Sequence, residues 1–160
     1  TVSQFDASLS WDDVREIRKK WGGKVIIKGI LDAEDARAAV NVGADAIVVS
    51  NHGGRQLDGA LSAIKALPAI VDAVGDKAEV WMDGGIRSGQ DVLRAIAIGA
   101  QGTLIGRAFL YGLGAGGQAG VTKALEIIHK ELDLTLGLCG QSELRKVDSS
   151  ILLAAESDHR

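Results

Sequence analysis

EDARAAVNVGADAIVVS (34–50) and QDVLRAIAIGAQGTLIG (90–106) follow one pattern, position by position, and so form an internal repeat. In both stretches a helical periodicity runs through Gly-Ala into a short apolar segment, so that Gly43 aligns with Gly99. A helix that leads directly into a strand is the building block of α/β proteins. The two copies begin at residues 34 and 90, so one repeat is 56 residues long, which is the length of two β/α units. The chain is therefore predicted to contain four such units.

Four short apolar runs are predicted as the strands. Each run is dense in β-branched or large apolar residues without clean alternation, which is typical of parallel strands covered on both faces. The runs are KVIIK (24–28), AIVVS (46–50), EVWMD (79–83) and GTLIG (102–106).

Helical patterns precede the first of these strands and follow each of them. Asp32 and Ser88 stand where two of the helices begin, and both residue types are favoured at N-caps. The alternation of helices and strands predicts right-handed crossovers and a parallel sheet. The predicted helices span 12–21, 32–43, 61–75, 88–100 and about 118–136.

Four β/α units fit two architectures: a complete small doubly wound domain, or half of an eight-stranded TIM barrel, which closes only with eight units. The polar residues favour the barrel. Lys28, Ser50, Asp83 and Gly106 all fall at the C-terminal ends of predicted strands, where barrel enzymes build their active sites. We therefore expect an α/β fold of parallel (β/α) units that forms half of a (β/α)8 barrel.

Composition narrows the function classes. The net charge of −3 without a cluster of basic residues argues against nucleic acid as a partner. Cys139 is the only cysteine, which excludes an internal disulfide and fits a reducing compartment. There is no apolar run of about 20 residues, and we expect neither a signal peptide nor a metal site. We expect a cytoplasmic protein, or one held at the surface of the inner membrane.

Glycine and the first residue of the chain carry further information. The chain has 21 glycines and one proline, which indicates ordered turns where backbone approaches another group, rather than a disordered linker. Because the chain opens on Thr1 instead of a methionine, we expect it to be a piece of a longer protein.

The loop SNHGGRQLDGA (50–60) carries the clearest chemistry. A neutral imidazole such as that of His52 can accept a proton near pH 7. The guanidinium of Arg55 can hold a carboxylate by two parallel hydrogen bonds, and Gly53-Gly54 lets the backbone pass close to a substrate. Together these residues suit a small hydroxy acid. Taken alone, a loop histidine beside a solvated arginine is the alternative.

Two glycine-rich turns predict a phosphate site. DGGIRSG (83–89) follows the third strand, and its Ser88 begins a helix whose positive end faces the same side. GRA (106–108) follows the fourth strand and adds a second arginine. Barrels commonly bind phosphate at the loops after their last two strands. Lys28 needs a negatively charged partner at its strand end, such as a cofactor edge, unless it bends into solvent.

SNHGGRQLD, together with IKG, DGGIRSGQDVLRAIAIGA and LIGRAFLYGL, resembles the FMN-dependent 2-hydroxy acid dehydrogenases and oxidases. The likeness runs from about Phe5 to about Ile151, and its most specific motif is SNHGGRQ. Within the family it is closest to the bacterial L-lactate dehydrogenases, through VIIKGILDAEDA and SNHGGRQLDGALS. This chain resembles only the second half of the family's barrel, and residues 1–160 are expected to form that half, with a frayed tail at 156–160.

The resemblance implies an activity: FMN-dependent oxidation of an L-2-hydroxy acid, most of all L-lactate, to the 2-oxo acid. His52 would be the base, Arg55 would bind the substrate carboxylate, and Lys28 would face the edge of the flavin. It also implies a set of residues that contact FMN, namely Lys28, Ser50, Asp83, Gly84, Gly85, Ile86, Arg87, Gly106 and Arg107.

The family's first-half groups have no counterpart in this chain. These are the substrate-contacting tyrosines, a glutamine and a threonine near the flavin, a second arginine, and an aspartate that orients the histidine. We therefore expect a partner that supplies the missing half-barrel, or self-association into a homo-oligomer. Two alternatives stay open: a half-barrel that binds FMN or another phosphate without turnover, and an unrelated enzyme on a phosphate-binding barrel.

Overall fold

A parallel sheet in the order β1-β2-β3-β4 organises the chain, and the computed structural model describes residues 8–153. Neighbouring strands pair in parallel throughout, so all four C-terminal ends lie at one edge of the sheet. This confirms the predicted α/β fold of parallel (β/α) units. The strands are β1 (Ile26–Ile30), β2 (Ala46–Val49), β3 (Glu79–Asp83) and β4 (Gly102–Leu104).

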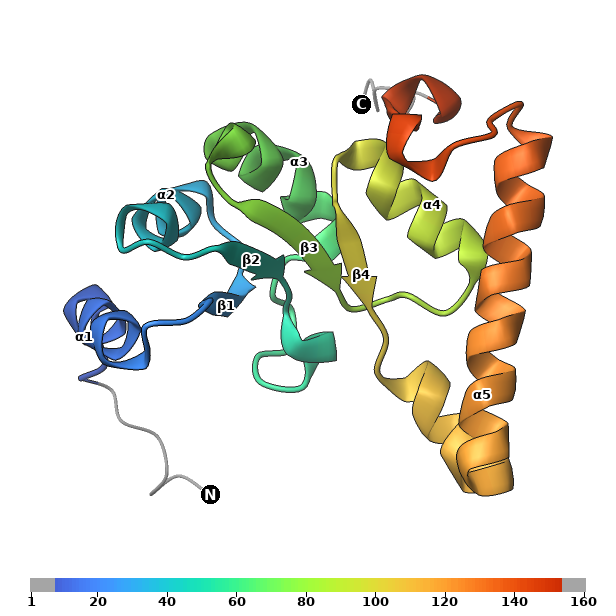
Figure 1. Ribbon diagram of the computed structural model, residues 1–160, viewed down its shortest axis with the longest axis horizontal. Helices are drawn as coiled ribbons and strands as arrows, with labels where there is room; N and C mark the ends of the chain where they lie inside the picture. Colours follow the sequence, from blue (N-terminus) through green and yellow to red (C-terminus); the bar gives the residue numbers. More distant parts are fainter. Residues whose placement is uncertain (1–7, 154–160) are drawn as a thin grey trace.

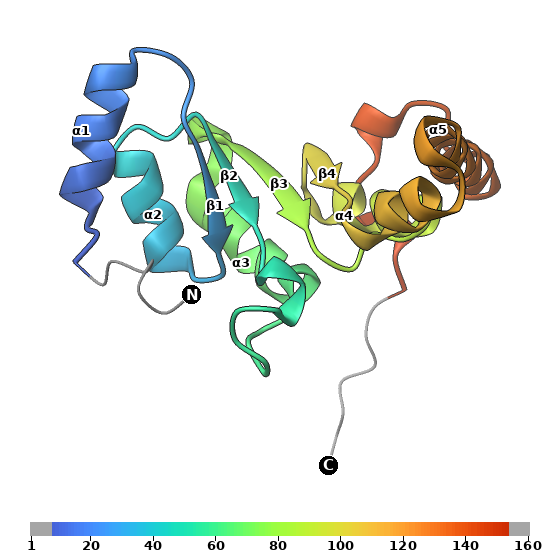
Figure 2. The same ribbon diagram turned by 90° about the horizontal axis from the view of Figure 1, so that it is seen from below.

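The helices form an arc along one side of this sheet (Figure 1). They are α1 (Trp11–Trp21), α2 (Ala33–Asn41), α3 (Ala63–Val74), α4 (Gly89–Ile98) and α5 (Arg107–Leu138). Short 3₁₀ turns occupy His52–Gly54, Gly75–Lys77, Leu144–Lys146 and Ser149–Ile151. Figure 2 shows the arrowheads of β1, β2 and β3 pointing to the side from which the loop after β2 projects.

The predicted elements all exist, but some of their bounds differ. β1 starts at Ile26 and not at residue 24, because the residues before it are bonded to Asp45, and it continues past a register shift between Lys28 and Ile30. β4 ends at Leu104 because Gly106 already turns the backbone into α5. The predicted tail 156–160 lies outside the described residues.

Helix α5 is longer than the predicted helix of 118–136. It contains a kink at Gly116 and Gly117, whose backbone angles are not helical, so the predicted segment is its second limb. The limbs fold back on each other at Gly112 and Gly120, where a Cβ added to either residue would clash with the carbonyl oxygen of the other. Only residues without a side chain allow this approach. Cys139, the C-cap of α5, is exposed rather than part of the core.

The internal repeat is visible in equivalent structural roles. Asp32 and Ser88, which occupy matching positions of the repeat, are the N-caps of α2 and α4. Asp45 and Gln101 also match, and each accepts a hydrogen bond from the backbone N–H of an earlier residue, Val25 at 2.9 Å in the first case and Val80 at 2.7 Å in the second.

The two faces of the sheet differ in burial. Side chains that point toward the helices form the core, and Ile47, Val49 and Leu67 are completely buried there. The other face is buried at Ala46 and Val48 of the central strand β2, but it carries Ile26, which is 47% exposed, and the partly buried Trp81. Because β1 and β4 are the outer strands, their outer edges have no strand partner among residues 8–153.

Asp45 anchors the N-terminal edge of the sheet. Its carboxylate accepts hydrogen bonds from Lys24 Nζ at 2.8 Å, from the backbone of Val25, and from Arg18 of α1 at 2.7 Å. These bonds, with that of Lys24 the strongest, hold the pKa of the Asp45 carboxyl well below its usual range. The arrangement ties α1 and the start of β1 to β2.

Asp45 should therefore contribute to stability in a pH-dependent way. Its pKa is lower in the folded chain than the value near ~3.9 of an unfolded chain, so its contribution is complete above that value and is lost as the pH falls below it. We expect Asp45→Asn to lower the melting temperature at pH 7, with a difference from wild type that shrinks below about pH 4. Thermal unfolding across pH measures this. Asp72→Asn, at an exposed site on α3, is the control, and a pH-independent difference for Asp45→Asn would contradict the assignment.

Candidate active site

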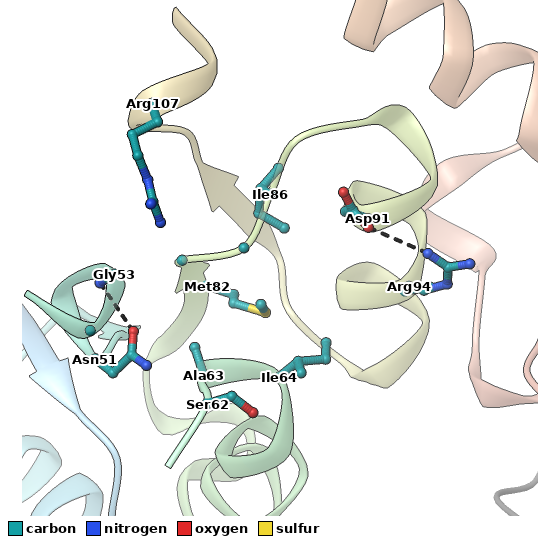
Figure 3. Close-up of a pocket in the computed structure, with 13 residues that line it drawn as sticks. Asn51, Gly53, Ser62, Ala63, Ile64, Met82, Ile86, Asp91, Arg94 and Arg107 are labelled. Atoms are coloured by element: carbon teal, nitrogen blue, oxygen red, sulfur yellow. Dashed lines mark hydrogen bonds and ion pairs between the residues drawn. The ribbon is translucent and has the colours of Figure 1, made fainter. Parts of the chain in front are cut away.

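Two adjoining cavities lie at the C-terminal edge of the sheet, with volumes of about 310 and 400 Å³. The smaller is lined by the predicted chemical groups, including Lys28, His52, Arg55, Arg87 and Arg107. The larger lies between the loop after β2 and the start of α4 (Figure 3). Gly53, Gly84, Gly85, Ile86 and Arg107 line both cavities. Among the described residues no cluster of three metal-ligating side chains occurs.

Three strands contribute to one polar network beside the smaller cavity. Lys28 Nζ of β1 lies 2.6 Å from Asp83 Oδ2 of β3. Ser50, which follows β2, donates its hydroxyl hydrogen to the same Asp83 oxygen at 2.8 Å, and Lys28 donates to Ser50 Oγ at 3.2 Å. Lys28 thus has the negatively charged partner that its place on the strand requires, and that partner belongs to the protein.

The Asp83 carboxyl remains ionised in this setting. Its partial burial raises the pKa, but the hydrogen bonds from Lys28 and Ser50 and the charge of Lys28 outweigh burial. The net effect lowers the pKa of Asp83 below its usual value. A carboxylate can only accept hydrogen bonds, so Ser50 must be the donor in their contact.

The loop after β2 has an unusual backbone. His52, Gly53 and Gly54 all have positive φ, of 54°, 67° and 72°. This left-handed conformation is easy for glycine but costs other L-residues roughly 1–2 kcal/mol. Asn51 supports the turn, because its side chain accepts the Gly53 N–H at 3.0 Å. His52 and Arg55 are exposed, and both line the smaller cavity.

The N-terminus of α4 does not offer the free N–H groups that the sequence suggested. Asp91 accepts the backbone N–H groups of Arg87 and Ser88, each at 3.0 Å. Glu131 of α5 accepts the N–H of Gly89 at 3.0 Å. Because two carboxylates already close this helix end, an anion would not find its partners there.

The N-terminus of α5 is different. Gly106 is its N-cap and makes no side-chain cap hydrogen bond. The Arg107 side chain extends from this helix end toward Gly53 and Asn51 of the loop after β2 (Figure 3). Opposite it, Gly84 and Gly85 have φ of 101° and 83° and bear no side chains. A helix end, a guanidinium and a stretch of backbone without side chains therefore meet at the wall shared by the two cavities, a setting suited to an anion.

The structure brings the predicted site residues together, and all of them except Ser50 line the smaller cavity. Ser50 is 2% exposed and lines neither cavity. Sequence reasoning missed Asn51, which supports the turn at His52, and the carboxylates of Asp91 and Glu131 at α4. Asn51 could have been found from the preference of asparagine for turns. Glu131 is distant in sequence from its partner Gly89, and no local pattern points to it.

This chain is similar to one family of FMN-dependent proteins and to curated L-lactate dehydrogenases. The family described as FMN-dependent dehydrogenase matches residues 1–154. An L-lactate dehydrogenase of Caulobacter vibrioides is 54% identical over 151 residues, and one of Pseudomonas syringae pv. syringae is 54% identical over 154 residues. The first alignment covers 94% of this chain and 39% of the relative, and the second 96% and 40%.

Solved structures agree with these relatives. A mandelate oxidase variant that carries a monooxide FMN adduct superposes with a TM-score of 0.83 at 49% identity, covering 88% of this chain and 45% of that one. Mandelate oxidase with benzoyl-formic acid gives 0.82 at 49%, covering 85% and 41%. The chain thus spans about two fifths of the length of the curated relatives it matches. The match over nearly the whole chain, on a sheet whose C-terminal edge gathers Lys28, His52 and Arg55, means that this chain belongs to the FMN-dependent dehydrogenase family.

Proposed function

We propose that this chain is part of an enzyme that uses FMN to oxidise an L-2-hydroxy acid, L-lactate, to the 2-oxo acid. The main support for the proposal is the convergence of Lys28, His52, Arg55 and Arg107 on one cavity of about 310 Å³. The identity of the substrate rests on the relatives named L-lactate dehydrogenase. No helix within residues 8–153 is long and apolar enough to cross a membrane.

The residues present fit FMN. Its phosphate suits the start of α5, where Arg107, Arg87 and the bare backbone of Gly84 and Gly85 line the cavity. Lys28 is half-exposed beside the same cavity, and its ammonium suits a flavin edge that becomes negative. Asp83 and Ile86 line the cavity as well, as does Gly106. When bound, FMN would supply the acceptor for two electrons.

The protein's own groups would then bind and orient the substrate. The Arg55 guanidinium holds the substrate carboxylate by two parallel hydrogen bonds. The His52 imidazole, on the same loop, accepts a proton from the substrate and stores it as imidazolium. The shape of this short loop is set by the left-handed backbone of residues 52–54.

An alternative function is binding of FMN or another phosphate without turnover. The anion setting is built from β3, β4 and α5 and lies entirely within this chain. Lactate added without oxygen to the flavin-loaded whole protein distinguishes the two: bleaching of the flavin absorbance supports the enzyme, and a flavin that stays oxidised supports the binding module.

Closure of the sheet is the remaining part of the proposal. The outer edges of β1 and β4 carry unpaired backbone groups beside apolar side chains within the described part of the chain, and such edges pair with other strands. We expect them to pair with the remaining strands of the whole protein or, in their absence, with another copy of this chain.

Substitutions at the loop after β2 test the chemistry. His52→Gln should keep FMN but lower kcat by ~10²–10⁴-fold, because the base is lost. Arg55→Lys should raise KM roughly tenfold or more and also lower kcat, since a bidentate contact between charged groups contributes about 1.5–3 kcal/mol per hydrogen bond. Anaerobic flavin reduction by L-lactate in the whole protein measures both. If His52→Gln reduces its flavin as fast as wild type, His52 is not the base.

Arg107 tests the phosphate site. Arg107→Ala should lower FMN occupancy, because a guanidinium at the start of α5 and its contribution to anion binding are removed. Flavin absorbance per protein measures the occupancy after purification and again after titration with FMN. Arg37→Ala, at an exposed position of α2, is the matched control. Full occupancy in Arg107→Ala would place the phosphate elsewhere.

The open edge can be tested on this chain alone. Ile26 of β1 is 47% exposed. Sedimentation velocity should show self-association of the wild-type chain, which Ile26→Lys weakens because a lysine disfavours edge pairing. Ala69→Lys, at an exposed position of α3, which packs on the central strands β2 and β3, should associate as wild type does. A wild-type chain that stays monomeric at micromolar concentration would refute this part.

A further inference from the structure

His52 is the one residue other than glycine with a positive φ among residues 8–153. This conformation costs a histidine roughly 1–2 kcal/mol, because its Cβ crowds the backbone, and such a residue persists where its surroundings fix it. Something in the fold must therefore fix the backbone at the residue that the proposed function makes the base.

The fixing contact comes from Ser50. Its Oγ accepts the backbone N–H of His52 at 3.0 Å. The same oxygen accepts from Lys28 Nζ at 3.2 Å, and its hydrogen goes to Asp83 at 2.8 Å. A serine hydroxyl has one hydrogen and two lone pairs. All three are thus engaged by protein groups.

The burial of Ser50 supports this role. Ser50 is 2% exposed and is the one polar residue in the core of the described part of the chain. It lines neither cavity, so its hydroxyl has neither a free bonding direction nor an open path to a ligand.

We propose that Ser50 is a positioning residue for His52. Its hydroxyl accepts the His52 N–H and is hydrogen-bonded to the ion pair of Lys28 and Asp83, which holds the left-handed backbone of His52 in place. The inference rests on the proposed function, in which His52 is the base. Without the hydroxyl, the His52 N–H loses its acceptor and the loop is free to leave the left-handed conformation. The His52 imidazole then spends less time in the position from which it can accept the substrate proton, while Arg55 can still bind the substrate carboxylate.

The contact can be tested without flavin or substrate. In the full chain labelled with ¹⁵N, the amide hydrogen of His52 should exchange slowly with solvent, because it is bonded to Ser50 Oγ. Ser50→Ala should speed its exchange at least tenfold more than it speeds the exchange of core amides such as Ile47. Ser149→Ala, at an exposed serine, should change nothing. A wild-type His52 amide that exchanges as fast as an unprotected one overturns the proposal, even if Ser50→Ala does not fold.

Kinetics in the flavin-loaded whole protein test the consequence. Ser50→Ala should lower kcat on the order of 10- to 100-fold, as expected for a misplaced catalytic group, with KM little changed. In the His52→Gln background the same substitution should have almost no further effect. Ser50→Thr, which keeps the hydroxyl, should restore part of the rate.

The outcomes separate this inference from the proposed function. If Ser50→Ala lowers kcat by the same factor with and without His52, Ser50 acts independently of the histidine and the inference is wrong. If His52→Gln alone has no effect on flavin reduction, the proposed function fails, and the amide exchange of His52 still decides whether the contact exists.

Discussion

The ion pair between Lys28 Nζ and Asp83 Oδ2, 2.6 Å long, is the contact on which the site depends. It connects β1 to β3 across β2, and the Ser50 hydroxyl is hydrogen-bonded to both partners. A charged pair at the edge of a core needs several hydrogen bonds to offset the loss of water. Ser50 supplies them, and its last lone pair reaches the backbone of His52. One network therefore connects the core to the loop that carries the chemistry.

The N-terminal and C-terminal ends of the strands differ in their role. At the N-terminal edge, Asp45 binds Arg18 and Lys24 and joins α1 to the sheet. At the C-terminal edge, the ion pair of Lys28 stands beside an open cavity with His52 and Arg55. Parallel strands make this division possible, because every strand begins at one edge and ends at the other. Changes that stabilise the first edge can leave the second unaltered.

Cationic groups at the C-terminal edge are not all equivalent. Lys28 is neutralised within the protein by Asp83, whereas no ion pair forms with Arg55, Arg87 or Arg107 among the described residues. The three arginines therefore leave a net positive charge around the cavity. That charge suits two anionic groups. One is the phosphate of a cofactor such as FMN, and the other is the carboxylate of a substrate.

Local sequence signals were enough to predict the parallel α/β fold and to select residues that line one cavity. The internal repeat, the N-caps Asp32 and Ser88, and the polar strand ends are all of this kind, and the structure confirms the sheet and both caps. The motif after the second strand also pointed to His52 and Arg55, which do meet at one cavity. These features depend on neighbours in sequence, which is why they could be predicted.

The pairing of polar groups, in contrast, depends on how distant segments pack. Lys28 and Asp83 come from different strands, and Glu131 reaches Gly89 from another helix, so no local pattern encodes either contact. The Glu131 contact removes the N-terminus of α4 as an anion site and leaves that of α5. Burial of Ser50 likewise follows from three strands packing side by side, and it places the Ser50 hydroxyl within reach of the His52 N–H. Hydrogen bonds between distant segments form only after the chain has folded, because the fold sets their distances and excludes the water that would otherwise satisfy them.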